Sequence, residues 1–138
     1  MGVMREIGRL GSERGRKNEE RMYDSIVRVR GSVPLKWITS IRRATRTEDR
    51  EGVDLIVESD VGPLYLQVKS SAAGQARFER RRRKKLIACI VVPACDEELD
   101  RRVRASLTYM RATIKKKRAM LDQKDTEHDR EIEHDSDF

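Results

Sequence analysis

Two short segments in which apolar and polar residues alternate constrain this chain more than any other feature of its sequence. In residues 53–58 the apolar positions 53, 55 and 57 alternate with Asp54, Ile56 and Glu58, and residues 64–69 alternate again. Between them, residues 59–63 read Ser-Asp-Val-Gly-Pro, which is typical of a tight turn. A period of two is that of a β-strand, so the sequence predicts an antiparallel hairpin with one apolar face.

The opposite face of this hairpin gathers three polar side chains, because directly opposed residues share a face. A two-residue loop at Asp60-Val61 places Asp54 opposite Gln67, whereas a loop at Val61-Gly62 places it opposite Lys69. Both registers bring the three side chains together. A slip by one residue would exchange the polar and apolar positions, which burial of one face forbids.

The rest of the pattern predicts one α/β domain. We expect a helix over residues 17–30, with the glycines among residues 1–17 opposing a firm helix, then a strand over 35–43 and a loop over 44–52. The hairpin is followed by a helix over about 75–85, a uniformly apolar strand over 86–92 that suits burial on both faces, and a helix over 96–121. A meander followed by a strand–helix–strand crossover predicts a mixed sheet with helices packed on it. Residues 1–121 would form a single domain, and residues 122–138 an acidic, disordered tail.

The charge distribution points to a polyanionic partner. The net charge is +7, but residues 122–138 carry −6, so the remainder of the chain carries +13. DNA or RNA is the first candidate, and no membrane partner is expected, because the basic residues lack an interleaved apolar face. The two cysteines are too few for a disulfide framework, and the N-terminus lacks the apolar region of a signal peptide, so we expect a cytoplasmic protein. The tail would either keep the protein in solution or fold back over the basic body.

The three polar residues of the hairpin are suited to metal-assisted chemistry. A carboxylate and an amide oxygen are hard ligands of the kind that Mg²⁺ or Mn²⁺ prefers. A lysine on the same face could hold a phosphate oxygen or help to deprotonate an attacking water. A third ligand would come from elsewhere, and the first helix offers Glu19 and Glu20.

The segments Gly52-Val53-Asp54-Leu55-Ile56-Val57 and Leu66-Gln67-Val68-Lys69-Ser70-Ser71 resemble the PD-(D/E)XK nuclease superfamily. The resemblance covers about residues 14–92 and implies a restriction-endonuclease-like αβββαβ core, followed here by a C-terminal helix. It also implies a metal-dependent endonuclease that hydrolyses DNA phosphodiester bonds with Mg²⁺ or Mn²⁺ and no organic cofactor.

The same resemblance assigns roles to individual residues. Asp54 and Lys69 take the places of the family's aspartate and lysine. Residues 14–21 resemble the segment of archaeal Holliday-junction resolvases whose glutamate completes the metal site, which makes Glu20 the matching ligand and leaves Glu19 one position off. Gln67 stands where most members have an acid and is similar to the branch that includes Mrr-type restriction endonucleases; it removes one negative charge from the site.

Further residues are candidates for contact with the nucleic-acid backbone. They are Arg42, Arg43, Arg46, Ser70, Arg80, Arg81, Arg82, Arg83, Lys84 and Lys85. A symmetric cut of two strands would call for a homodimer. Two alternatives stay open: a non-catalytic nucleic-acid-binding module that keeps the fold, and a basic adaptor that docks through its C-terminal helix.

Overall fold

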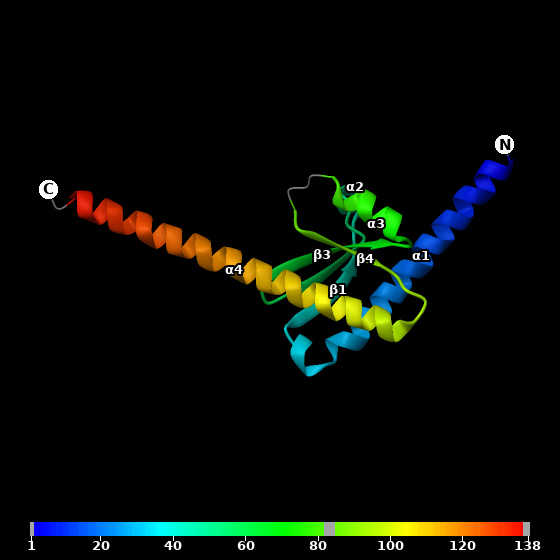
Figure 1. Cartoon of the computed structure of the whole chain (residues 1–138), viewed down its shortest axis with the longest axis horizontal. Coiled ribbons are helices and arrows are strands. Elements are labelled where there is room, and N and C mark those ends of the chain that lie inside the picture. The colour runs from blue at the N-terminus through cyan, green and yellow to red at the C-terminus, as the bar shows by residue number, and fades with distance from the viewer. Residues whose placement is uncertain (1, 82–84, 137–138) are drawn as a thin grey trace.

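The computed structural model of the chain describes the backbone of residues 2–81 and 85–136 and, within these, the side chains of residues 15–81 and 85–126. Its elements follow in the order α1 (Gly2–Arg30), the 3₁₀ helix η1 (Val33–Leu35), β1 (Ile38–Arg43), α2 (Arg46–Arg50), β2 (Leu55–Ser59), β3 (Gly62–Lys69), α3 (Ala72–Glu79), β4 (Ile87–Val91) and α4 (Asp96–Ser136). Two long helices, α1 and α4, flank the strands and extend beyond them in different directions (Figure 1).

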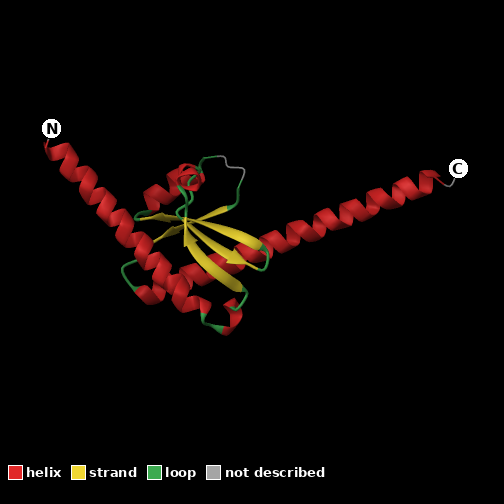
Figure 2. Cartoon of the chain, turned by 180° about the vertical axis from the view of Figure 1, so that it is seen from behind, coloured by secondary structure: helices red, strands yellow, loops and turns green. Residues whose placement is uncertain are grey.

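The four strands form one mixed sheet in the order β1-β2-β3-β4 (Figure 2). Strands β1, β2 and β3 pair antiparallel, whereas β3 and β4 pair parallel through the crossover helix α3. The expectation of an α/β fold with a mixed sheet and a C-terminal helix is therefore confirmed.

The hairpin of β2 and β3 has the first of the two registers that the sequence left open. Ser59 pairs with Gly62 across the two-residue turn Asp60-Val61, and Leu55 pairs with Leu66 at the other end. Continued by one residue, this register places Asp54 opposite Gln67. The polar side chains of the hairpin thus share a face, as the alternation predicts.

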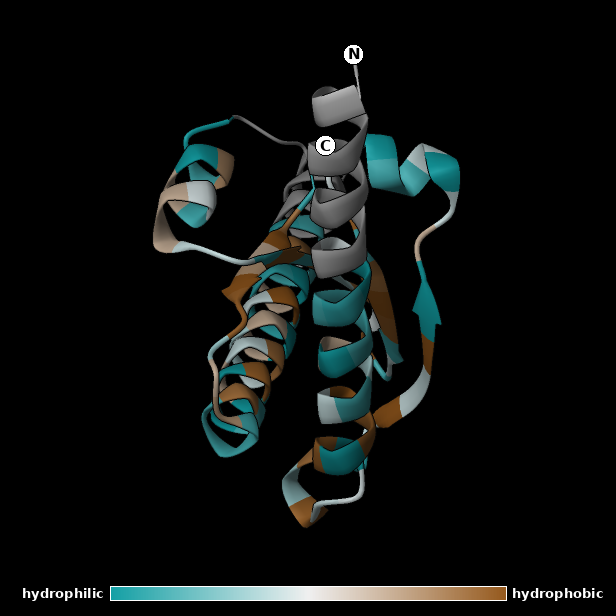
Figure 3. Ribbon diagram, turned by 90° about the vertical axis from the view of Figure 1, so that its right-hand side faces the viewer, coloured by the Kyte–Doolittle hydropathy of each residue, from teal (hydrophilic) through white to brown (hydrophobic). Residues whose placement is uncertain are grey.

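The apolar face of the hairpin forms the core together with α1 and α4. The core includes Leu55, Val57, Leu64 and Leu66 from the hairpin, Met22, Ile26 and Val29 from α1, and Leu99, Val103, Leu107 and Met110 from α4. In each helix these residues recur at steps of three and four, which aligns them along one side. Hydropathy colouring accordingly alternates along the helices beside the sheet, whereas α2 is hydrophilic (Figure 3).

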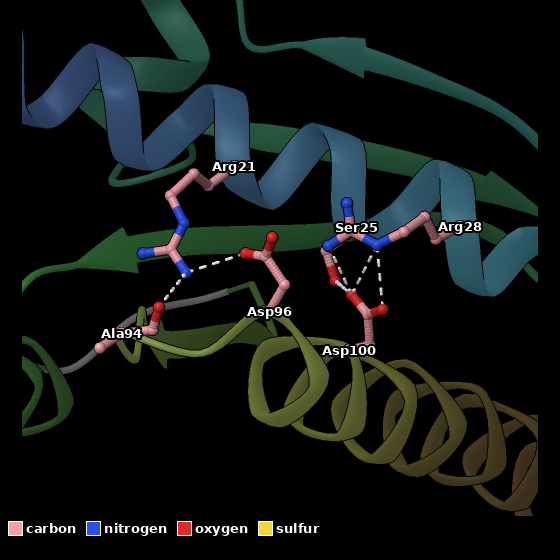
Figure 4. A network of polar contacts seen from close by, with 6 residues as sticks. All are labelled: Arg21, Ser25, Arg28, Ala94, Asp96 and Asp100. Atoms are coloured by element: carbon pink, nitrogen blue, oxygen red, sulfur yellow. Dashed lines mark hydrogen bonds and ion pairs between the residues drawn. The ribbon is translucent and has the colours of Figure 1, made fainter.

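A polar network joins α1 to the first turns of α4 (Figure 4). Ser25, which is fully buried, donates through Oγ to Asp100 Oδ1 at 2.5 Å. Arg28 pairs with the same carboxylate at 2.8 Å, and Arg21 pairs with Asp96 at 3.0 Å. These contacts hold the C-terminal third of α1 against the start of α4.

In the N-terminal half of the chain, the structure differs from three expectations. Helix α1 begins at Gly2 rather than near residue 17, because glycine weakens a helix by about 1 kcal/mol per residue without forbidding it. Strand β1 begins at Ile38 rather than residue 35, because residues 33–35 form the 3₁₀ turn, closed by a bond from Trp37 Nε1 to Pro34 O at 2.7 Å. The expected loop over 44–52 contains α2, which begins at a capping box between Thr45 and Glu48.

In the C-terminal half of the chain, the structure differs from three further expectations. Helix α3 spans residues 72–79 rather than 75–85, because the Ser71 side chain caps it by accepting from Gly74 N at 3.1 Å. Strand β4 is an edge strand and is only half-buried along most of its length, so it is not covered on both faces. Helix α4 continues to Ser136, so the structure does not show the expected disordered tail, and the end of α4 points away from the basic body (Figures 1 and 2).

Over the residues that the structure describes, no helix combines the length and the apolar character that crossing a membrane requires.

Candidate active site

Asp54 lies just before the start of β2, and hydrogen bonds hold both its backbone and its side chain. Its N–H donates to Leu66 O at 2.8 Å, and its carbonyl accepts from Ala44 N at 3.0 Å. Its Oδ2 accepts from Val68 N at 2.8 Å. Together these bonds fix the carboxylate against the C-terminal half of β3.

Two further carboxylates, Glu19 and Asp49, lie close enough to Asp54 to affect its ionisation. Burial is the largest cause that raises the pKa of Asp54 to about 6, and the charges of Glu19 and Asp49 add to it, while the Val68 N–H and Lys69 act in the opposite direction. Burial also raises the pKa of Glu19, with a further contribution from Asp49. Holding the partly buried Glu19 and Asp54 near each other, with the exposed Asp49 nearby, costs free energy, which a bound cation would offset.

Gln67 supplies the other unusual feature of the site. Its side chain is only 8 % exposed, and its Oε1 is the one buried side-chain nitrogen or oxygen among the described residues without a hydrogen-bond partner. A buried acceptor left without a donor costs about 1–3 kcal/mol. This oxygen is therefore available to a cation or to a donor that the chain itself does not provide.

Two surface depressions meet at Asp54, Gln67 and Lys69. The first, of about 390 Å³, lies toward α2 and α3 and is also lined by Asp49, Arg50, Glu51, Gly52, Phe78 and Arg81. The second, of about 410 Å³, lies toward α1 and is also lined by Gly15, Asn18, Glu19, Val68 and Ser70. We call Glu19, Asp54, Gln67 and Lys69 the carboxylate–lysine site; it draws its residues from α1, β3 and the start of β2, at one end of the sheet.

The structure brings Glu19, rather than Glu20, to this site. Glu19 lines the depression beside Asp54, whereas Glu20 is exposed and lines neither depression. The periodicity of α1 already contained this signal, since Glu19 precedes the buried Met22 by three residues and the buried Ile26 by seven. A step of one residue turns a side chain by about 100°, so the two glutamates cannot exchange roles.

Lys69 lies at the end of β3 with its Nζ 5.9 Å from the centre of the Phe78 ring. It makes no ion pair with any residue that the structure describes. Its ammonium group is therefore free to face an anion in the depression that it shares with Asp54 and Gln67.

The basic residues expected to hold a phosphate backbone divide into two groups. Arg42 and Lys85 already have acidic partners, Glu48 at 2.8 Å and Glu51 respectively, so a phosphate would have to compete for them. Arg43 lies near the site, because its charge lowers the pKa of Glu19.

The other candidates have no ion pair among the described residues. Arg46 and Arg80 are exposed at the ends of α2 and α3, and Ser70 and Arg81 line the depressions at the site. Arg82, Arg83 and Lys84 lie outside the described residues.

Sequence reasoning did not find Asp49 or Arg77. Asp49 is brought to the site by α2, a five-residue helix that the sequence pattern did not indicate. Arg77 lies on α3 one turn from Arg81 and faces a basic depression next to Lys69. Both positions depend on where short helices dock, and no local pattern in the sequence reports that.

Comparison with known proteins gives no match, either to a family model, to a curated protein or to a solved structure. Within the described residues there is also no group of three or more histidine, cysteine, aspartate or glutamate side chains placed to hold a metal ion. What the carboxylate–lysine site offers instead is a mixed set of oxygen donors: two carboxylates and the amide oxygen of Gln67.

Proposed function

We propose that the chain is a metal-dependent nuclease that hydrolyses DNA phosphodiester bonds at the carboxylate–lysine site. The observation that carries the proposal is the buried Oε1 of Gln67, which lacks a partner among the described residues and lies beside the partly buried Asp54, whose pKa is raised. The order helix, three-strand meander, helix, parallel strand agrees with the resemblance to the PD-(D/E)XK nucleases and so supports the proposal.

The donor atoms at the site are oxygens, the type that Mg²⁺ and Mn²⁺ prefer. Mg²⁺ usually keeps several waters and takes one or two carboxylates from the protein, so it does not need a cage of three acids. Glu19, Asp54 and the Gln67 oxygen would hold such an ion. Asp49, farther along the same depression, would add negative charge without direct contact and so offset part of the charge that Gln67 removes.

A bound divalent cation would polarise the scissile phosphate and make a bound water more acidic. Side chains of the protein would position the ion and the phosphate. Asp54, whose Oδ2 accepts from the Val68 N–H, would offer its other oxygen to the ion. Lys69 would pair with a non-bridging phosphate oxygen and stabilise the charge that develops on it during hydrolysis.

Nicking of supercoiled plasmid in Mg²⁺ or Mn²⁺ tests this directly. Asp54→Asn and Lys69→Met should each reduce the rate by about a hundred-fold or more, because each removes a charge that acts at the reacting phosphate. Asp24→Asn is the matched control, since Asp24 is an exposed aspartate on the same helix as Glu19 and lines neither depression. Cleavage that persists without a divalent cation, or that survives Asp54→Asn, would refute the proposal.

The second candidate is a nucleic-acid-binding module that keeps this fold without the chemistry. Gln67 favours it, because an amide in place of an acid leaves only two carboxylates lining the depression toward α1. Calorimetric titration with Mn²⁺ separates the two candidates: the nuclease binds the ion and loses it in Asp54→Asn, whereas the module binds DNA but no ion. Retained DNA binding with no cleavage of supercoiled, linear or branched DNA would establish the second candidate.

A further inference from the structure

A separate basic depression adjoins the carboxylate–lysine site on the side of α3. It has a volume of about 240 Å³ and is lined by Lys69, Gly74, Arg77, Phe78 and Arg81. Three of these five residues are cations and none is an acid. We call this depression the basic pocket.

The cations of the basic pocket have no acidic partners among the described residues. Neither Lys69, Arg77 nor Arg81 takes part in an ion pair there, whereas Arg42, Lys85 and other basic residues of the chain do. Arg77 lies on α3, whereas Arg81 lies two residues beyond its end, and both line the same depression. The C-terminal dipole of α3 favours a cation near its end, but like charges that converge without an acid between them repel each other.

Gly74 and Phe78 shape the floor of the pocket and position Lys69. A Cβ on Gly74 would lie in ordinary contact with Lys69 Cδ, at 3.5 Å, so the lysine stem lies against the first turn of α3. Phe78 is buried beneath the lysine, with its ring centre 5.9 Å from Nζ. Lys69 is thus held on the wall between the basic pocket and the depression that contains Asp54.

We propose that the basic pocket binds a second phosphate of the DNA backbone, the one adjacent to the phosphate held at the carboxylate–lysine site. Lys69 would lie between the two phosphates, and Arg77 and Arg81 would close around the second. This deepens the proposed function and rests on its nucleic-acid partner, but it requires neither a metal nor cleavage.

The salt dependence of DNA binding tests the pocket without any catalytic readout. Fluorescence anisotropy with a labelled 16-base-pair duplex in EDTA gives the slope of log K against log salt concentration. Each neutralised phosphate contributes about 0.9 to this slope, and the basic pocket holds one, so the double variant Arg77→Gln/Arg81→Gln should lower the slope by about that amount and each single variant by a smaller amount. Between 50 and 200 mM salt, the ratio of wild-type to double-variant affinity should accordingly shrink by about 3- to 4-fold.

Arg104→Gln is the matched control, because Arg104 is exposed on α4, has no ion pair among the described residues and does not line the pocket. It should leave the slope unchanged. A second readout uses a series of duplexes, each with one phosphate replaced by a neutral methylphosphonate at a different position. For the duplex that lacks the charge of the phosphate bound in the basic pocket, Arg77→Gln should no longer change the affinity.

Unchanged slopes for Arg77→Gln and Arg81→Gln would overturn the proposal, as would an equal loss in Arg104→Gln, since binding would then report total charge alone. Thermal unfolding of each variant confirms that it is folded. The two proposals can fail independently. If the wild-type protein nicks DNA but Arg77→Gln leaves the salt dependence of binding unchanged, the nuclease proposal holds and the proposed phosphate site in the basic pocket does not.

Discussion

Replacing Asp54 by asparagine should stabilise the metal-free protein at pH 8. Burial raises the pKa of Asp54 from its ordinary value of 3.8 to about 6, so the folded state binds this proton more tightly than the unfolded state does. Stability therefore falls as the pH rises from about 4 to about 6 and stays lower above that range. The full shift corresponds to a ceiling of ~3 kcal/mol. Because Asp54 is only partly buried, solvent screening reduces the expected gain to about 1–2 kcal/mol.

The asparagine keeps an acceptor for the Val68 N–H, so the charge is the main thing that changes. Urea unfolding in EDTA, followed through the single tryptophan, Trp37, measures the difference at pH 4, 6 and 8. We expect the free energy of unfolding of the variant to exceed that of wild type by about 1–2 kcal/mol at pH 8 and to be nearly equal to it at pH 4. Asp24→Asn should show no such trend. A variant that is less stable at pH 8, or a difference independent of pH, would refute the reasoning.

Three other substitutions test turn geometry and packing in the fold. Gly52→Ala and Gly62→Ala form a matched pair, because both glycines have a positive φ, +93° and +97°, but only the Cβ at 52 would lie 2.9 Å from the Phe78 ring. Chemical denaturation should show a loss of about 1 kcal/mol for Gly62→Ala and about 2–3 kcal/mol for Gly52→Ala; equal losses would mean that the ring moves aside freely. Ser25→Ala removes a buried donor to Asp100 and should lower the free energy of unfolding by about 1–2 kcal/mol; an unchanged urea midpoint would show that Arg28 satisfies that carboxylate alone.

The hairpin could be predicted from sequence because its determinants are local. A period of two specifies the faces of a strand, and the turn residues limit the register to two choices. The structure selects the turn Asp60-Val61, which pairs Leu55 with Leu66 and continues to place Asp54 opposite Gln67. The mixed character of the sheet also followed from the pattern, because a strand–helix–strand crossover returns the chain as a parallel strand, whereas the structure supplies the order of the four strands.

The acidic neighbours of Asp54 could not be predicted in the same way. The resemblance of residues 14–21 to a family segment favoured Glu20, but the side of α1 that faces the sheet is set by the packing of Met22 and Ile26, and this brings Glu19 to the site. Asp49 arrives through the docking of α2, which the sequence pattern did not reveal.

The sequence by itself determined the two faces of the hairpin, the mixed order of the sheet and the charge of the body. Only the tertiary structure decided that Asp49 lies near Asp54, which arginines are already paired, and that Gln67 carries a buried oxygen without a partner among the described residues. The physical reason is how far along the chain each kind of interaction reaches. Alternation and turn chemistry act between neighbours in the chain, whereas burial and the interaction of charges depend on segments that meet only when the chain has folded.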